Sequence, residues 1–154
     1  MADHRLELIR PAPAALSAAL PQWARVVEES LSMLSSMSEE VVPVLLHRDF
    51  HLRQCLADNE RVGVVDWDLF AAGDPAFDVA YFTTYLETHG LGTGLADAFL
   101  AGYAHGGGPE VEPRLGAYRG FNLLRRACRR FRLHDAGWER EMSRMLASLE
   151  TALP

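Results

Sequence analysis

The stretch from Val44 to Ala80 constrains the fold more than any other part of the chain. It contains two short apolar runs, Val44–Leu46 and Val62–Val65, and a cluster of polar residues follows each run directly. Runs this short are typical of buried strands, because a helix needs about ten residues or more. The polar clusters therefore stand at strand ends, where side chains from different segments can meet.

A hairpin is predicted within this stretch. Gln54–Ala57 has the pattern of a short strand, Asp58–Glu60 that of a turn, and the second apolar run that of the returning strand. Such a hairpin brings Gln54 close to Asp66, which follows the returning strand. The loop that carries Asp49 comes just before the hairpin, so three side chains with oxygen atoms are expected to converge.

The rest of the chain is predicted to be mostly helical, after a flexible lead-in at residues 1–13. Apolar residues recur at helical spacing, and Gly or Pro stands near most of the expected helix ends. The predicted helices cover residues 14–20, 21–37, 75–88, 95–105, 112–133 and 137–149. The expected fold class is therefore α+β, mostly helical, with helices around a small β-hairpin insert.

Composition limits the classes of function. No apolar run approaches the roughly 18 residues of a membrane span, and the charged N-terminus does not resemble a signal peptide. Cys55 and Cys128 form no pairing motif, which predicts reduced thiols in a cytosolic protein. The net charge is −6, so no nucleic-acid or membrane partner is expected. The arginine cluster within residues 125–132 is expected to be a solvated helix face.

The types of basic residue limit the possible mechanisms further. All 15 are arginine, and the 154 residues contain no lysine. A mechanism that requires a lysine therefore needs one from outside this sequence.

The three converging side chains suit a hard cation. Mg²⁺ prefers oxygen ligands and usually takes one or two protein carboxylates together with substrate phosphates and water. Asp66 is the natural carboxylate ligand, and Gln54 can add its carbonyl oxygen. Asp49 is then left to accept a proton from a substrate hydroxyl. The segment His47–Gln54 follows the H-R-D-x-x-x-x-N layout of phosphoryl-transfer loops, with glutamine in place of asparagine.

These motifs resemble the catalytic core of the aminoglycoside phosphotransferase and choline kinase-like superfamily. The shared features are H-x-D-x-H-x-x-[N/Q] at His47–Gln54, V-V-D-W-D at Val64–Asp68 and G-D-P-x-x-D at Gly73–Asp78. The flanking helices also fit that family's C-terminal lobe, so the resemblance covers about residues 14–150. It implies the C-terminal lobe of a protein-kinase-like fold.

The resemblance also implies roles for individual residues. Asp49 would be the catalytic base or would position the acceptor hydroxyl, and His47 would brace the loop by hydrogen bonding. Gln54 and Asp66 would hold Mg²⁺ on the phosphates of ATP. The aspartates that follow are expected to be mainly structural: Asp68, Asp74 and Asp78.

A second lobe is implied as well. Kinases of this kind have an N-terminal lobe with a phosphate-covering loop and a strand lysine that pairs with the ATP phosphates. Neither feature is found before His47, so the N-terminal nucleotide lobe is expected to be absent from this chain. Another chain would supply it, or a homo-oligomer would form through an exposed apolar face. The alternative function is a non-catalytic, pseudokinase-like binding module.

Overall fold

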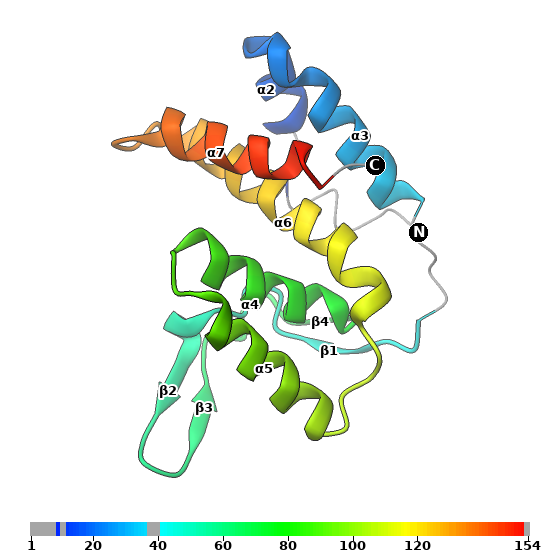
Figure 1. The fold of residues 1–154 in the computed structure, drawn as a ribbon, viewed down its shortest axis with the longest axis vertical. Coiled ribbons are helices and arrows are strands. Elements are labelled where there is room, and N and C mark those ends of the chain that lie inside the picture. Colours follow the sequence, from blue (N-terminus) through cyan, green and yellow to red (C-terminus); the bar gives the residue numbers. More distant parts are fainter. Residues whose placement is uncertain (1–8, 10–11, 37–40, 153–154) are drawn as a thin grey trace. The chain divides into compact units, whose positions relative to one another are not determined.

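The computed structural model describes residue 9, residues 12–36 and residues 41–152. Most of the predicted lead-in lies outside the described residues. The chain divides into two compact units, one made of the described residues before position 37 and those from Gly120 onward, and the other of the residues between them up to Arg119. Figure 1 shows the elements of both units.

The first unit consists of helices. Its elements are α2 (Ala12–Ala19), the 3-10 turn η1 (Pro21–Trp23), α3 (Ala24–Ser35), the part of α6 (Glu112–Leu133) from Gly120 onward, and α7 (Trp138–Glu150). Both α2 and α7 contact α3, and buried side chains such as Leu16, Leu34 and Leu146 fill the core. A Cβ added at Gly120 would lie 3.3 Å from Leu149 Cδ1, so α6 and α7 pack closely there.

The helices of this unit agree with the predicted segments. The α2 helix begins at Ala12, two residues before the predicted start, and η1 separates it from α3. Within the predicted arginine cluster on α6, Arg130 forms ion pairs with Asp135 and with Glu141, whereas Arg129 and Arg132 are exposed. The cluster was expected to be a solvated helix face, and it is solvated in part, because Arg125, Arg126 and Arg130 are only partly exposed.

The second unit carries the strands. Its elements are β1 (Val44–Leu46), the 3-10 turn η2 (Leu52–Gln54), β2 (Cys55–Ala57), β3 (Val62–Val64), β4 (Ala71–Gly73), α4 (Ala76–Thr88), α5 (Thr93–His105) and the start of α6. The predicted hairpin is confirmed: β2 and β3 pair antiparallel with Cys55 opposite Val64 and Ala57 opposite Val62. In Figure 1 this hairpin extends away from α4. The fold is α+β and mostly helical, as expected.

A second pair of strands was not predicted. β1 pairs antiparallel with β4, with Val44 opposite Gly73 and Leu46 opposite Ala71. A Cβ added at Gly73 would lie only 2.7 Å from Leu46 Cδ1, so the glycine permits a close approach of the two strands. The sequence Ala71–Gly73 contains no β-branched or aromatic residue, and its strand pattern is therefore weak.

The prediction that Val44–Leu46 is a buried strand is wrong in part. Leu46 is 2% exposed, but Leu45 is 64% exposed, and Val62 on β3 is 70% exposed. Side chains along a strand point alternately to opposite faces. On β1 the covered face is the one that carries Leu46, and Leu45 points to the opposite, open face.

The α4 helix forms the centre of this unit. Asp74 Oδ1 accepts a hydrogen bond from the Ala76 backbone N–H at 2.9 Å, which is the predicted capping interaction, although the helix begins at Ala76 rather than Pro75. Phe82, Tyr85 and Leu86 of α4 form a buried cluster, and Phe50 and Phe99 pack against it. Among the described residues, no helix has the length and apolar character needed to cross a bilayer.

Candidate active site

A partly buried carboxylate on α4, that of Asp78, holds the loop that follows β1. The backbone N–H of His47 donates to Asp78 Oδ2 at 2.6 Å, and that of Arg48 donates to Asp78 Oδ1 at 2.9 Å. Arg48 has a positive φ of 68°, a conformation that costs non-glycine residues about 1–2 kcal/mol. The two hydrogen bonds to one side chain stabilise this unfavourable backbone path. Burial raises the pKa of Asp78, and the two backbone donors partly oppose that rise.

His47 connects this loop to the end of β3. Its ring is buried, and Nε2 lies 2.8 Å from the carbonyl oxygen of Val65, the residue before Asp66. A carbonyl oxygen only accepts hydrogen bonds, so Nε2 is the nitrogen that carries the proton. The ring also packs against Trp67, with ring centroids 4.8 Å apart. The contacts of His47 therefore join the ends of two strands that are distant in sequence.

Asp49 lies two residues further along the loop and faces α4. The hydroxyl of Tyr81 donates to Asp49 Oδ1 at 2.6 Å, and His51 Nε2 lies 3.8 Å from Oδ2. The ring of His51 stacks on Tyr85 of α4, with ring centroids 4.9 Å apart. The Asp49 side chain is 31% exposed. A carboxylate that is oriented on one side and open to solvent can accept a proton from a bound hydroxyl.

The hairpin brings Gln54 and Asp66 together, as its strand pattern predicts. Gln54 Nε2 donates to Asp66 Oδ2 at 2.7 Å, and the backbone N–H of Val65 donates to the Gln54 carbonyl at 3.0 Å. Asp66 is exposed and has a positive φ of 66°. The structure thus places two of the three predicted oxygen-bearing side chains in direct contact, while the hydrogen bond of Asp49 leads to α4.

The Gln54–Asp66 pair fits a magnesium ion that shares its coordination with a nucleotide. Rotating the amide of Gln54 by 180° exchanges Nε2 for Oε1, and both residues then present oxygen ligands at the same point. Among the described residues, no group of three or more His, Cys, Asp or Glu side chains is placed to hold a metal ion. Magnesium sites that use phosphates and water need only one or two protein carboxylates.

Of the two remaining aspartates of the motifs, Asp74 has structural contacts. Asp74 Oδ2 accepts a hydrogen bond from Arg114 Nε at 2.8 Å, which ties the start of α4 to the start of α6. Asp68 is exposed in the turn between β3 and β4. The roles expected for Asp74 and Asp78 agree with these contacts.

Tyr81 was not among the predicted site residues. It lies three residues after Asp78 on α4, and residues three apart share one face of a helix. Because Asp78 faces the loop, Tyr81 faces it as well. Extending the G-D-P-x-x-D motif by one helical turn would have identified it.

Comparison with known proteins assigns the family. A family model described as the phosphotransferase enzyme family matches residues 2–118. The chain therefore belongs to the phosphotransferase enzyme family. The match includes every motif between His47 and Asp78 but ends within α6, whereas the resemblance was expected to reach about residue 150. Searches among curated proteins and among solved structures gave no significant match.

Proposed function

We propose that this chain is the catalytic lobe of a cytoplasmic phosphotransferase that depends on ATP and Mg²⁺ and transfers a phosphoryl group to the hydroxyl of a small molecule. Family membership supports phosphoryl transfer in general. The observation that carries the finer proposal is the contact of Gln54 with Asp66 beside a loop whose backbone is fastened by Asp78. This arrangement follows the layout of kinase-like active sites.

In the proposed mechanism the protein mainly positions groups and stabilises charge, because phosphoryl transfer requires little covalent work from it. Asp49 would accept the proton of the acceptor hydroxyl as that oxygen attacks. Tyr81 holds Oδ1 of this carboxylate through its hydrogen bond, and Oδ2 lies 3.8 Å from His51 Nε2. Gln54 and Asp66 would hold Mg²⁺, which would neutralise negative charge on the phosphates of ATP.

The lysine that pairs with the phosphates in such enzymes is proposed to come from outside these 154 residues, which contain none. A nucleotide-binding lobe on another chain, or an oligomer, would supply it. Leu56 and Val62 on the hairpin are large, apolar and exposed, and a contact with such a lobe would cover them.

A second candidate is a non-catalytic binding module of pseudokinase type. The same exposed apolar hairpin and the lack of lysine favour it. In this case the Gln54–Asp66 pair would have no function in metal binding, and the protein would show no affinity for ATP with Mg²⁺.

Calorimetric titration of ATP and Mg²⁺ into the wild type and two variants tests these proposals. Asp66→Asn removes the charge, and asparagine tolerates positive φ better than alanine, which would add about 1–2 kcal/mol of backbone strain. The control is Asp97→Asn, which removes an exposed carboxylate from α5. We expect affinity for the Mg²⁺ nucleotide to fall at least about tenfold in Asp66→Asn, since loss even of groups that support a metal ligand costs about 10- to 100-fold.

The outcomes separate the candidates. Unchanged binding by Asp66→Asn would exclude Asp66 as a metal ligand. If neither the wild type nor the control binds the nucleotide, the result supports the non-catalytic module or a site that requires the second lobe. Repeating the titration after adding a lysine-bearing nucleotide lobe distinguishes these two cases.

A further inference from the structure

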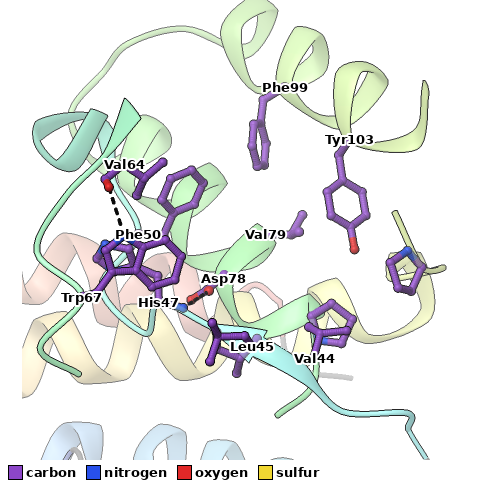
Figure 2. Close-up of a pocket in the computed structure, with 13 residues that line it drawn as sticks. Val44, Leu45, His47, Phe50, Val64, Trp67, Asp78, Val79, Phe99 and Tyr103 are labelled. Carbon is purple, nitrogen blue, oxygen red and sulfur yellow. Dashed lines mark hydrogen bonds between the residues drawn. The ribbon is translucent and has the colours of Figure 1, made fainter. Parts of the chain in front are cut away.

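A pocket of about 390 Å³ lies in the second unit beside the loop that carries Asp49. Figure 2 shows Phe99 and Tyr103 extending from α5 toward side chains of β1 and of the loop, with Val79 of α4 between them. Ligand pockets have volumes of about 300–1,000 Å³ and mostly apolar walls. The size and lining of this pocket therefore suit a small organic molecule.

Most of the wall is apolar, and four aromatic side chains form part of it: Phe50, Trp67, Phe99 and Tyr103. Phe50 stacks on Phe82 with ring centroids 4.9 Å apart, and Phe82 in turn contacts Phe99 at 4.3 Å. Trp67 lines the other side, where its Nε1 donates to the Val64 carbonyl at 2.9 Å and fixes the ring. A flat ring of a ligand could stack on these aromatic side chains or contact them edge to face, and both geometries are favourable for aromatic pairs.

One wall residue has an unused hydrogen-bond acceptor. Nε2 of His47 carries the proton and donates to Val65, so Nδ1 of the neutral ring bears a free lone pair. Nδ1 is buried, and none of the described residues forms a hydrogen bond with it. A buried polar atom without a partner is unfavourable. A ligand with a hydrogen-bond donor would satisfy it.

The opposite wall offers a second polar atom. The hydroxyl of Tyr103 is also buried, and it has no hydrogen-bond partner within the described parts of the chain. Burial, with a smaller contribution from the charge of Asp74, raises the pKa of Tyr103, so the hydroxyl stays protonated near neutral pH. It can donate to an acceptor on a substituent of the same ligand.

We propose that this pocket binds a flat aromatic molecule of one or two fused rings that carries an N–H or O–H group, which donates to Nδ1 of His47. None of Asp49, Gln54 and Asp66 lines the pocket, although the carboxylate of Asp78, which holds the loop, does. The inference does not rest on the proposed function. The two sites are nevertheless connected, because His47 belongs to both the pocket wall and the loop.

The test compares two ligands of nearly equal shape. Indole has an N–H donor, whereas indene has a CH₂ group in its place. Each is titrated into ¹⁵N-labelled protein, and chemical shifts are followed for the amides of pocket residues and, for comparison, of α7. We expect both to shift the pocket resonances, with indole binding about 3- to 10-fold more tightly, as the net gain of one hydrogen bond predicts.

Two variants with the same substitution provide the control. Leu45 lines the pocket and Leu56 does not, and both are exposed leucines on short strands. Leu45→Trp fills part of the pocket and should weaken indole binding at least tenfold, whereas Leu56→Trp should leave it unchanged. These measurements need no nucleotide, so their failure would leave the phosphotransferase proposal untouched.

Three results would overturn the inference. The first is an absence of shifts with either ligand, and the second is equal affinity for indole and indene. The third is a wild-type dimer in sedimentation experiments that Leu45→Trp dissociates while indole shifts no resonance, because a second copy of the chain would then occupy the pocket.

Discussion

The loop that carries Asp49 is held by hydrogen bonds to α4, whereas Gln54 and Asp66 lie at the open end of an exposed hairpin, opposite its turn. Asp78 accepts hydrogen bonds from two backbone N–H groups of the loop, and Tyr81 orients the Asp49 carboxylate. The Gln54–Asp66 pair is joined by one hydrogen bond between exposed side chains. In the proposed function, Asp49 as the base is oriented before the acceptor arrives, while Gln54 and Asp66 as metal ligands can adjust to an incoming nucleotide. The two halves of the site differ in this way.

The largest expected effect comes from Asp78→Ala. This change leaves the backbone N–H groups of His47 and Arg48 without their acceptor, and each unsatisfied buried group costs about 1–3 kcal/mol. We expect the free energy of unfolding of the second unit to fall by about 2–5 kcal/mol. Urea denaturation measures it in a background in which Trp23 and Trp138 are replaced by phenylalanine, so that the fluorescence reports Trp67. The control Asp97→Ala should stay within about 0.5 kcal/mol of the wild type. Equal effects of the two substitutions would show that the loop is not fastened through Asp78.

Tyr81→Phe should have the next largest effect. It removes the donor to Asp49 without changing the packing of the ring, and hydrogen bonds to charged groups contribute about 1.5–3 kcal/mol. Because Asp49 is partly exposed, we expect a smaller loss of stability, about 1 kcal/mol. In the complete enzyme, turnover should fall while affinity for the Mg²⁺ nucleotide stays unchanged. The matched control is Tyr103→Phe, which should leave turnover as it is; a parallel loss of nucleotide affinity in Tyr81→Phe would contradict a positioning role.

A pH effect should follow from the raised pKa of Asp78. The folded state holds this proton more tightly than the unfolded state, whose reference pKa is 3.8. The folded protein therefore binds more protons, and its stability falls as pH rises through this interval. Asp78→Asn cannot titrate, so the stability of the wild type relative to this variant should decrease as pH rises from about 4. Denaturation curves between pH 3 and pH 7 provide the measurement. If the stability of the wild type relative to Asp78→Asn increased with pH, folding would lower the pKa of Asp78 instead of raising it.

Gln54→Asn should have the smallest effect on stability. The shorter side chain loses about 1.5 Å of reach and with it the 2.7 Å contact with Asp66. Since the pair is exposed, the free energy of unfolding should change by less than about 0.5 kcal/mol, while affinity for the Mg²⁺ nucleotide falls several-fold. A stability loss as large as that of Asp78→Ala would show that the hairpin end is as firmly held as the loop.

The helices and the hairpin were predictable because their signals are local. The predicted helix 112–133 has the same bounds as α6, and the strand, turn and strand pattern produced the β2–β3 pair. Apolar periodicity and turn residues act within a few positions of the chain. The proximity of Gln54 and Asp66 follows from the same pattern, because a hairpin places its two ends side by side.

Contacts between segments distant in the sequence were not predictable in this way. The pairing of β1 with β4 depends on a glycine that lets Leu46 approach, and the Tyr81–Asp49 hydrogen bond joins a helix to a loop 32 residues away. Neither contact leaves a periodic pattern in the sequence. The exposure of Leu45 was also missed, because an apolar residue in a strand does not reveal which of its faces is covered.

The sequence by itself determined the residue types of the candidate site, their order, and the class of elements that carry them. Oxygen ligands, a loop aspartate and the absence of lysine are properties of composition and spacing. Only the tertiary structure decided that Asp78 and Tyr81 orient the loop, and that a pocket with two unused polar atoms lies beside it. The physical reason is that a hydrogen bond or a cavity depends on distances set by packing, and packing brings together residues that the linear chain keeps apart.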